Sequence, residues 1–161
     1  RYQTHDVIEV DGFLEQCPLI RFCGRANRTS DLVGEKLTEV FVASAIDRMA
    51  KRLSIVPAFA MLVPHRNSPG YRLIVELNGE SKKPSASTIA ATLESLLCEN
   101  PWYDHAIQVG QLSHLRVTVD ESNSGHQWDT YEKKCLSSGI RLGDIKPTSL
   151  ETRFDWDPAG D

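Results

Sequence analysis

An aspartate placed just before a strand-like run is the first residue that could carry chemistry. The chain opens RYQTHD, and Asp6 leads into the β-type run VIEV at 7–10. A carboxylate fixed where a strand begins can accept two hydrogen bonds from vicinal hydroxyls, as on the ribose of a nucleotide. Taken alone, the same pattern favours an aspartate that only caps a turn, so Asp6 becomes a ribose candidate only in combination with other residues.

A polar loop with several cations follows the second strand-like run. In FCGRANRTSDLVGEKLTE, residues 22–39, Arg25, Arg28 and Lys36 are candidate partners for phosphate charge. The small residues around Gly24 could form a hinge between two rigid elements. Neither the P-loop pattern nor the dinucleotide-binding glycine pattern is present. A solvated loop is the alternative interpretation.

A lysine near the end of the chain is the third candidate. Lys146 lies between Gly143–Asp144 and Pro147, and the proline favours an extended backbone at the residue before it. A lysine in a fixed place on a structured loop can act as a point charge on a phosphate, whereas most loop lysines are solvated. The aromatic tail RFDWD predicts that Trp156 packs back onto the domain.

The elements that must position these residues follow from hydrophobic periodicity and turn signals. Short strands at 7–10 and 19–24 come first, and a long amphipathic helix with Thr38 as its cap follows. A hairpin is expected at 58–64 and 71–77. Three further helices are expected at 88–99, 102–110 and 126–137, and one further strand at 115–119. This order predicts an α+β fold in which helices flank a small antiparallel, or mixed, sheet after a short two-stranded unit.

Composition places the chain among ordinary globular proteins. It has 161 residues, a formal net charge of −4 and 40% hydrophobic residues, which suits one domain with a real core. The absence of a basic stripe argues against a nucleic-acid partner. No run approaches the ~18 apolar residues of a membrane helix, and the first residues do not form an export signal. We therefore expect no membrane partner and a cytoplasmic location.

The cysteine spacing bears on metal binding, and the first residue bears on whether the sequence is part of a longer protein. Cys17, Cys23, Cys98 and Cys135 have no metal-site spacing, so we expect isolated buried thiols and no metal site. The sequence starts at Arg1 without a methionine and reaches a strand pattern within six residues. We expect a piece of a longer protein, with leading strands and a hinge at 1–25 and an α+β cap domain at 26–161.

Taken together, the three candidate sites resemble the C-terminal portion of adenylate-forming enzymes. Within that superfamily the sequence is most similar to the auxin-responsive (Gretchen Hagen) acyl-acid amido synthetase family. The similarity lies in the order of four features: YxTxD-VIEV, RFCGR, GEKLTE at a helix start, and a late loop lysine. That family carries Y-R-x-G-D-V-V-x-V, an arginine-rich turn, an acidic-Lys-x-Thr-Glu step and a late lysine. The sequence departs from this pattern at Gln3, at His5 and in the looser Gly34–Glu35–Lys36 step.

The resemblance implies an ATP-dependent ligase that joins a small carboxylic acid to an amino acid through an acyl adenylate. It implies that Tyr2, Thr4, Asp6 and Arg25 bind the nucleotide, with Asp6 on the ribose. It also implies that Lys36 and Lys146 are catalytic and reach the phosphates in alternate orientations of the domain. Mg²⁺ would be bound mainly by an N-terminal adenylation domain, the partner without which this piece is expected to be inactive.

Two other interpretations stay open at this point. An acyl-coenzyme A ligase would share the adenylation step and differ only in its acceptor. A stand-alone α+β module that binds a ligand or a protein would carry the same motifs by coincidence.

Overall fold

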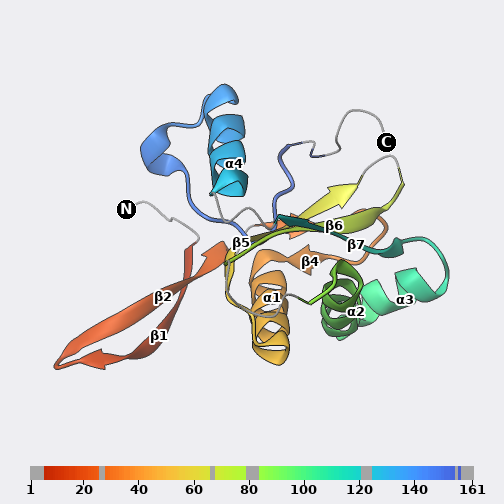
Figure 1. The fold of residues 1–161 in the computed structure, drawn as a ribbon, viewed down its shortest axis with the longest axis horizontal. Coiled ribbons are helices and arrows are strands. Elements are labelled where there is room, and N and C mark those ends of the chain that lie inside the picture. The colour runs from red at the N-terminus through yellow and green to blue at the C-terminus, as the bar shows by residue number, and fades with distance from the viewer. Residues whose placement is uncertain are drawn as a thin grey trace.

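A computed structural model of the chain shows a sheet with helices on both faces and a long hairpin projecting from one end (Figure 1). The structure describes residues 6–25, 28–65, 68–78, 84–120, 125–154 and 156, and for residues 23–25 it describes the backbone alone. Within these residues no helix is long and apolar enough to cross a membrane.

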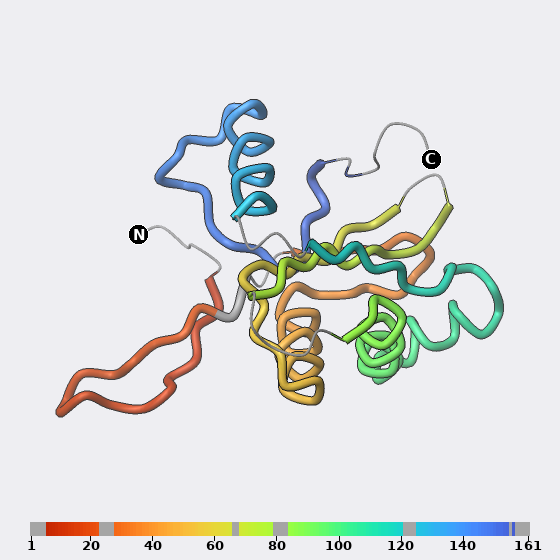
Figure 2. The backbone as a smooth tube through the Cα atoms, viewed as in Figure 1, coloured from red at the N-terminus to blue at the C-terminus, as the bar shows by residue number. Residues whose placement is uncertain are grey.

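The projecting hairpin consists of β1 (Asp6–Leu14) and β2 (Cys17–Arg25), paired antiparallel. Both expected strands are confirmed, and both are longer than the apolar runs that predicted them. Figure 2 shows the hairpin reaching well away from the rest of the chain. Because the tip lies far from any core, Cys17 is exposed, which corrects the expectation that all the cysteines are buried.

The central sheet has the order β5-β6-β7. Its strands are β5 (Pro57–His65), β6 (Gly70–Leu77) and β7 (Ser113–Asp120). The first two form the expected antiparallel hairpin, and β7 lies parallel to β6. A parallel neighbour requires a crossover connection, which is provided by α2 (Ala86–Leu97) and α3 (Pro101–Gln108). The sheet is therefore mixed, and the α+β class is confirmed.

The larger core lies between the sheet and the helices α1 (Glu39–Leu53), α2 and α3 on one face (Figure 1). Thr38 caps α1 as predicted, accepting a 3.3 Å hydrogen bond from the Phe41 amide. Alternation along β6 sends one set of side chains into this core, as its polar-apolar pattern predicts: Tyr71, Leu73, Val75 and Leu77.

A smaller core covers the other face of the sheet beneath α4 (His126–Ser137). Met61, Val63 and Ile74 from the sheet meet Tyr131 and Cys135 from the helix. The ring of Trp156 stacks on Tyr131 with centroids 6.4 Å apart. The expected return of the aromatic tail onto the domain is therefore confirmed.

Three short elements have no counterpart in the sequence prediction. They are β3 (Thr29–Ser30), β4 (Leu37–Thr38) and a 3₁₀ turn, η1 (Leu142–Asp144). β3 and β4 pair with each other antiparallel. Strands of two residues are too short to show a periodicity, so they are visible only in the folded chain.

Candidate functional site

Two predicted site residues, 140 positions apart in the sequence, meet at the base of the hairpin. The Lys146 Nζ atom lies 2.6 Å from Oδ2 of Asp6. The side chains are 41% and 18% exposed, respectively, so the pair is accessible from solvent on its lysine side. Asp6 is the first residue of β1, and its strand partner is Arg25. Two of the predicted nucleotide ligands, Asp6 and Arg25, are thus paired across the hairpin, although the Arg25 side chain lies outside the described atoms.

An aromatic ring forms the floor beneath this lysine. The Lys146 ammonium lies 5.5 Å from the centroid of Phe22, within the range of a cation–π interaction. Phe22 comes from β2, so the hairpin contributes both the carboxylate and the ring that contact the lysine. A lysine placed between a carboxylate and a ring face is held in a defined position, as a phosphate ligand requires.

The loop that carries Lys146 is held on both sides of the lysine. The Tyr131 hydroxyl donates a 3.0 Å hydrogen bond to the Lys146 carbonyl. Farther along, the Leu62 amide donates to the Ser149 carbonyl at 2.8 Å, and the Glu151 amide donates to the Leu62 carbonyl at 3.0 Å. Residues 149–151 thereby extend the sheet by one parallel bridge at the outer edge of β5. The lysine loop is therefore part of the folded body.

A buried glutamate in the first turn of α1 also holds the loop that carries Lys146. The Glu39 carboxylate accepts hydrogen bonds from the Thr148 hydroxyl and, at 3.3 Å, from the Ser149 amide. The Arg28 guanidinium donates to Thr148 and lies 3.8 Å from the same carboxylate. Arg28, which the sequence offered as a phosphate ligand, therefore holds the lysine loop in this structure.

The other predicted catalytic lysine lies at the opposite end of the sheet. Lys36 is exposed and follows Glu35, whose buried carboxylate accepts hydrogen bonds from the Leu32 amide at 2.8 Å and from the Tyr71 hydroxyl. Tyr71 is near the start of β6 and pairs with Pro64 on β5.

The two lysine loops are tied to different points along β5. The Lys146 loop is tied to Tyr131, whose ring contacts Phe59 near the start of β5, and to Leu62 through Ser149 and Glu151. Glu35 beside Lys36 is tied to Tyr71, which pairs with Pro64 near the end of β5. Figure 2 shows the segment after residue 28 running away from the hairpin before it turns back into α1. The structure brings Asp6 and Lys146 together and leaves Lys36 apart.

The backbone at Lys36 is unusual for a lysine. Its φ of 47° lies in the left-handed region that non-glycine residues adopt rarely, and Gly34 two residues earlier has φ 109°. The Gly34 amide donates to Asp31 at 2.7 Å, and this bond closes the turn. Tyr2 and Thr4, the remaining predicted nucleotide ligands, lie outside the described residues.

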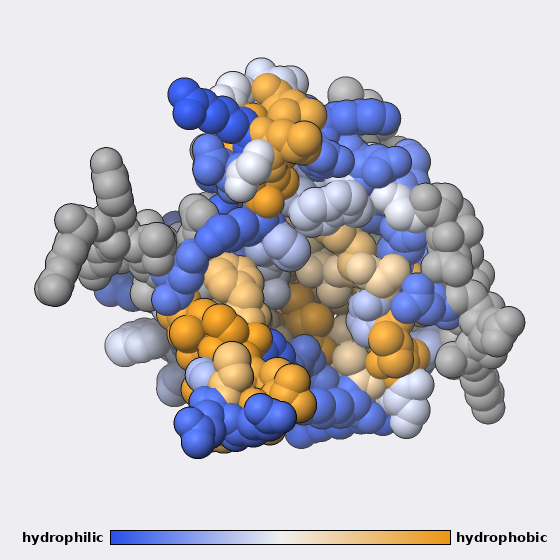
Figure 3. Space-filling view, turned by 90° about the vertical axis from the view of Figure 1, so that its left-hand side faces the viewer, coloured by the Kyte–Doolittle hydropathy of each residue, from blue (hydrophilic) through white to orange (hydrophobic). Residues whose placement is uncertain are grey.

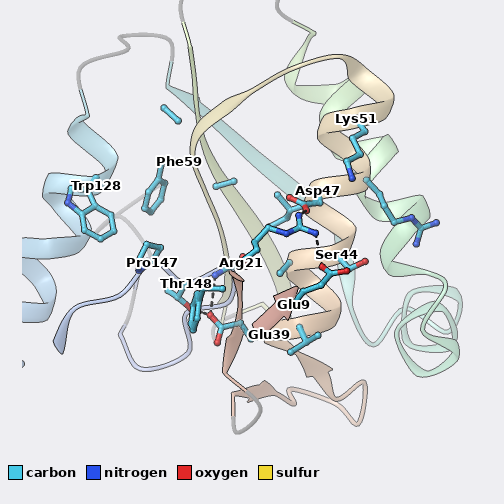
Figure 4. Close-up of a pocket in the computed structure, with 18 residues that line it drawn as sticks. Glu9, Arg21, Glu39, Ser44, Asp47, Lys51, Phe59, Trp128, Pro147 and Thr148 are labelled. Carbon is cyan, nitrogen blue, oxygen red and sulfur yellow. Dashed lines mark hydrogen bonds and ion pairs between the residues drawn. The ribbon is translucent and has the colours of Figure 1, made fainter. Parts of the chain in front are cut away.

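A cleft of about 560 Å³ opens beside the Asp6–Lys146 pair. Phe22 and Pro147, which flank the pair, belong to its lining, and α1 and β5 form the other walls. Figure 4 shows Phe59 and Trp128 on one side of the cleft and the charged residues Lys51, Asp47 and Glu9 on the other.

Arg21 bridges the hairpin and the body across this cleft. Its guanidinium donates to Glu9 of β1 at 2.7 Å and to Asp47 of α1 at 3.0 Å. The hydrogen bond that Arg21 donates to Glu9, followed by the charges of both carboxylates, raises the pKa of Arg21, so the bridge stays charged. In the part of the chain that is described, no group of three or more metal-binding side chains comes together.

A sequence model of the GH3 family C-terminal domain matches residues 40–152 of this chain. No curated protein sequence matches it. The cleft, the anchor of the lysine loop and both cores lie mainly within the matched region, whereas the hairpin precedes it.

Two acyl acid amido synthetase structures are among the solved structures similar to this one. "GH3.15 acyl acid amido synthetase" superimposes with a TM-score of 0.66 at 19% identity, and "AtGH3.15 acyl acid amido synthetase in complex with 2,4-DB" with 0.63 at 17%. Each match covers 95% of this chain and 28% of the other. The 161 residues therefore span a little over a quarter of the length of these proteins, and at this identity the likeness concerns the fold.

Proposed function

Because the chain belongs to the GH3 family, whose C-terminal domain it carries at residues 40–152, we propose that it is the mobile C-terminal part of an ATP-dependent acyl-acid amido synthetase. In this proposal the whole protein adenylates a small carboxylic acid and then passes the acyl group to the amine of an amino acid. The rest of the protein supplies the acyl pocket and most of the ATP site.

The observation that supports this proposal most is the 2.6 Å contact between Lys146 and Asp6. Each residue is a nucleotide candidate on its own sequence context, one as a ribose ligand and the other as a phosphate ligand. The ribose hydroxyls and the α-phosphate of one nucleotide are only a few ångströms apart, so their ligands must also be neighbours. The contact brings the two candidates, 140 positions apart in the sequence, close enough to bind one nucleotide.

In the first step, a carboxylate oxygen of the acid attacks the α-phosphorus, and the bond from that phosphorus to the β-phosphate oxygen breaks. Pyrophosphate leaves, and an acyl adenylate forms. Negative charge develops on the α-phosphate oxygens, where the Lys146 ammonium stabilises it. Asp6 accepts hydrogen bonds from the ribose hydroxyls and fixes the nucleotide relative to that ammonium.

In the second step, the amine nitrogen attacks the acyl carbon, the bond to the phosphate oxygen breaks, and AMP leaves as the amine loses a proton. Lys36 lies at the other end of the sheet from Lys146, so the two cannot contact one phosphate in the same arrangement. We assign Lys36 to an orientation of the domain that serves this second step, with the backbone around Arg25 as the hinge.

Mg²⁺ bound with ATP would neutralise part of the phosphate charge. Because the described residues hold no cluster of metal-binding side chains, we assign no metal ligand to this chain and derive no step through a metal.

The experiment is ATP–pyrophosphate exchange by the full-length protein with a panel of small carboxylic acids. Lys146→Ala is expected to lower the exchange rate by about 10²-fold, the scale for loss of a key electrostatic group. Lys133→Ala, which removes an exposed lysine on α4, is the matched control and should leave exchange unchanged. Exchange at the wild-type rate in Lys146→Ala would contradict the role of this lysine.

The acceptor is identified in the same preparation. With ATP and an accepted acid present, an amino acid should yield AMP and an amide, whereas coenzyme A should yield no thioester. A thioester in place of an amide would assign the protein to acyl-coenzyme A ligases, and the adenylation step would stand unchanged.

A further inference from the structure

The contact between Asp6 and Lys146 joins two groups that the proposed function assigns to one nucleotide. Nζ of Lys146 lies 2.6 Å from Oδ2 of Asp6. A pair of vicinal hydroxyls uses both oxygens of a carboxylate, one hydroxyl for each oxygen. Lys146 therefore lies on an oxygen that a ribose hydroxyl needs, and the lysine and the ribose compete for the same carboxylate.

The position of the pair gives a ligand access to both partners. Figure 3 looks onto the end of the molecule that carries the hairpin and shows the surface hollowed beside it. The cleft at this place is lined by Phe22 and Pro147, the residues that flank the pair. The lysine is the more exposed partner, with 41% of its side chain accessible against 18% for Asp6. A ligand that enters the cleft can therefore reach the ammonium as well as the carboxylate.

The lysine side chain, rather than its backbone, has to move when a ligand takes the carboxylate. The Tyr131 hydroxyl holds the Lys146 carbonyl at 3.0 Å, and residues 149–151 are hydrogen-bonded to β5. The flexible four-carbon stem of a lysine lets the ammonium shift while the loop stays in place. The Phe22 ring, whose centroid is 5.5 Å from the ammonium, offers the cation a favourable contact that does not involve Asp6.

The charge of the ligand decides whether the lysine leaves Asp6. A nucleoside offers hydroxyl groups to the carboxylate but no anion to the ammonium, so nothing compensates for the broken ion pair. A nucleotide also brings a phosphate, whose oxygens bind an ammonium through charge-assisted hydrogen bonds. The phosphate can therefore replace Asp6 as the partner of Lys146 and leave both carboxylate oxygens to the ribose.

We propose that Lys146 makes this site selective for phosphorylated nucleotides over nucleosides, because it covers the ribose ligand Asp6 until an α-phosphate binds its ammonium. The same ammonium thus has two opposite effects: it weakens the binding of a nucleoside and strengthens the binding of a nucleotide. The inference rests on the nucleotide roles of Asp6 and Lys146 in the proposed function, and it adds a discrimination that those roles do not require.

The test is isothermal titration calorimetry of the full-length protein with adenosine, AMP and ATP, in the absence of a carboxylic acid. Lys146→Met removes the ammonium and keeps an unbranched side chain over Phe22. We expect this variant to bind adenosine about three-fold more tightly than the wild type, which is the scale of a partly exposed ion pair. It should bind AMP and ATP at least ten-fold more weakly, which is the scale of a hydrogen bond to a charged group.

Two further variants separate this effect from a general change at the site. Lys133→Met removes an exposed lysine on α4 and should leave all three affinities unchanged. Lys146→Arg keeps a cation beside Asp6, so it should bind adenosine no more tightly than the wild type does. The opposite shifts of adenosine and AMP are expected only when the cation at position 146 is removed.

Two outcomes would overturn the inference and leave the proposed function standing. Weaker adenosine binding by Lys146→Met would show that the lysine supports Asp6 as a ribose ligand and does not compete with the ribose. Unchanged adenosine binding would show that the ion pair has no effect on the ribose site. Failure of the wild type to bind ATP would be a different result, because it would overturn the proposed function and the inference with it.

Discussion

The two loops that carry the candidate lysines are built from the same parts in different ways. Each is held by one buried glutamate and one buried tyrosine: Glu35 and Tyr71 for the Lys36 loop, Glu39 and Tyr131 for the Lys146 loop. Glu35 lies inside its own loop and binds amides two and three residues away. Glu39 lies more than a hundred residues from the amide and hydroxyl that it binds.

This difference determines what each loop can do. The Lys36 loop is closed largely by bonds within itself, to which Tyr71 and Asn100 add one bond each, and it presents an exposed lysine. The Lys146 loop has its shape only when α1, α4 and the edge of β5 have assembled. Lys146 is therefore fixed relative to the whole domain, as a residue that must face Asp6 requires.

The largest expected effect comes from removing the glutamate of each loop. Glu39→Ala would leave Arg28 mostly buried without its carboxylate and Ser149 without its acceptor, at a cost of about 3 kcal/mol in unfolding free energy. Denaturant titration measures this cost, and ATP–pyrophosphate exchange should fall with it. Glu35→Ala should also destabilise the protein yet leave exchange near the wild-type rate. An equal loss of exchange in both variants would contradict the prediction, because it would mean that both loops support the adenylation step.

The second prediction concerns the pH dependence of stability, because ionised Tyr131 can no longer donate its hydrogen bond to the Lys146 carbonyl. Burial raises the pKa of Tyr131 to about 12, against about 10 in an unfolded chain. A raised pKa gives stability that is fully present below pH 10 and is lost as pH rises toward 12. With allowance for partial solvent screening, the difference corresponds to about 2 kcal/mol in the free energy of unfolding.

Tyr131→Phe removes this titration and is the variant that checks it. Unfolding free energy measured from pH 9 to 12 should fall less steeply in Tyr131→Phe than in the wild type, although burial also raises the pKa of Tyr71 and of Tyr103. At neutral pH the variant should lose about 1 kcal/mol, the net value of one hydrogen bond. Parallel pH curves for the two proteins would contradict the assignment.

The third prediction separates the two lysines by reaction step. Lys36→Ala should leave ATP–pyrophosphate exchange within two-fold of wild type, and should slow amide formation from a preformed adenylate by about ten-fold, which is ~1.4 kcal/mol. Single-turnover measurement of each step makes the distinction, with Lys133→Ala as control. Loss of exchange in Lys36→Ala would place both lysines in the first step.

The smallest expected effect concerns backbone conformation. Lys36→Gly should stabilise the protein by up to about 1 kcal/mol, because glycine adopts the left-handed conformation at this position without strain. Lys146→Gly has no such strain to relieve and should destabilise the loop by about 0.5 kcal/mol. Thermal unfolding of the two variants gives the comparison, and a shift in the same direction for both would contradict it.

Much of the fold was readable from the sequence because its elements are long and periodic. The helix capped by Thr38, the hairpin 57–77 and the alternation along β6 all follow from local patterns. The family resemblance was likewise carried by short local motifs, and the family is confirmed. The resemblance implied that Asp6 and Lys146 both act on one nucleotide, at the ribose and at the phosphates, but it did not predict the direct contact between them.

The residues that hold the Lys146 loop in place could not be predicted from the sequence, for a physical reason. Glu39 in the first turn of a helix has the sequence of an ordinary exposed residue that complements the helix dipole. Tyr131 lies in a helix with few other apolar residues, and Thr148 follows a proline in a polar stretch. Their roles arise from pairings across more than a dozen to more than a hundred positions, and a single sequence carries no local signal of such pairings.

The bridge between Leu62 and Leu150 at the outer edge of β5 has a consequence for solubility. Without residues 149–151, β5 would present an open edge rich in apolar side chains, and such edges template pairing between molecules. A chain shortened before Thr148 should therefore aggregate as well as lose activity. Residues 149–151 therefore act as an edge strand that blocks β5 from pairing with a second molecule.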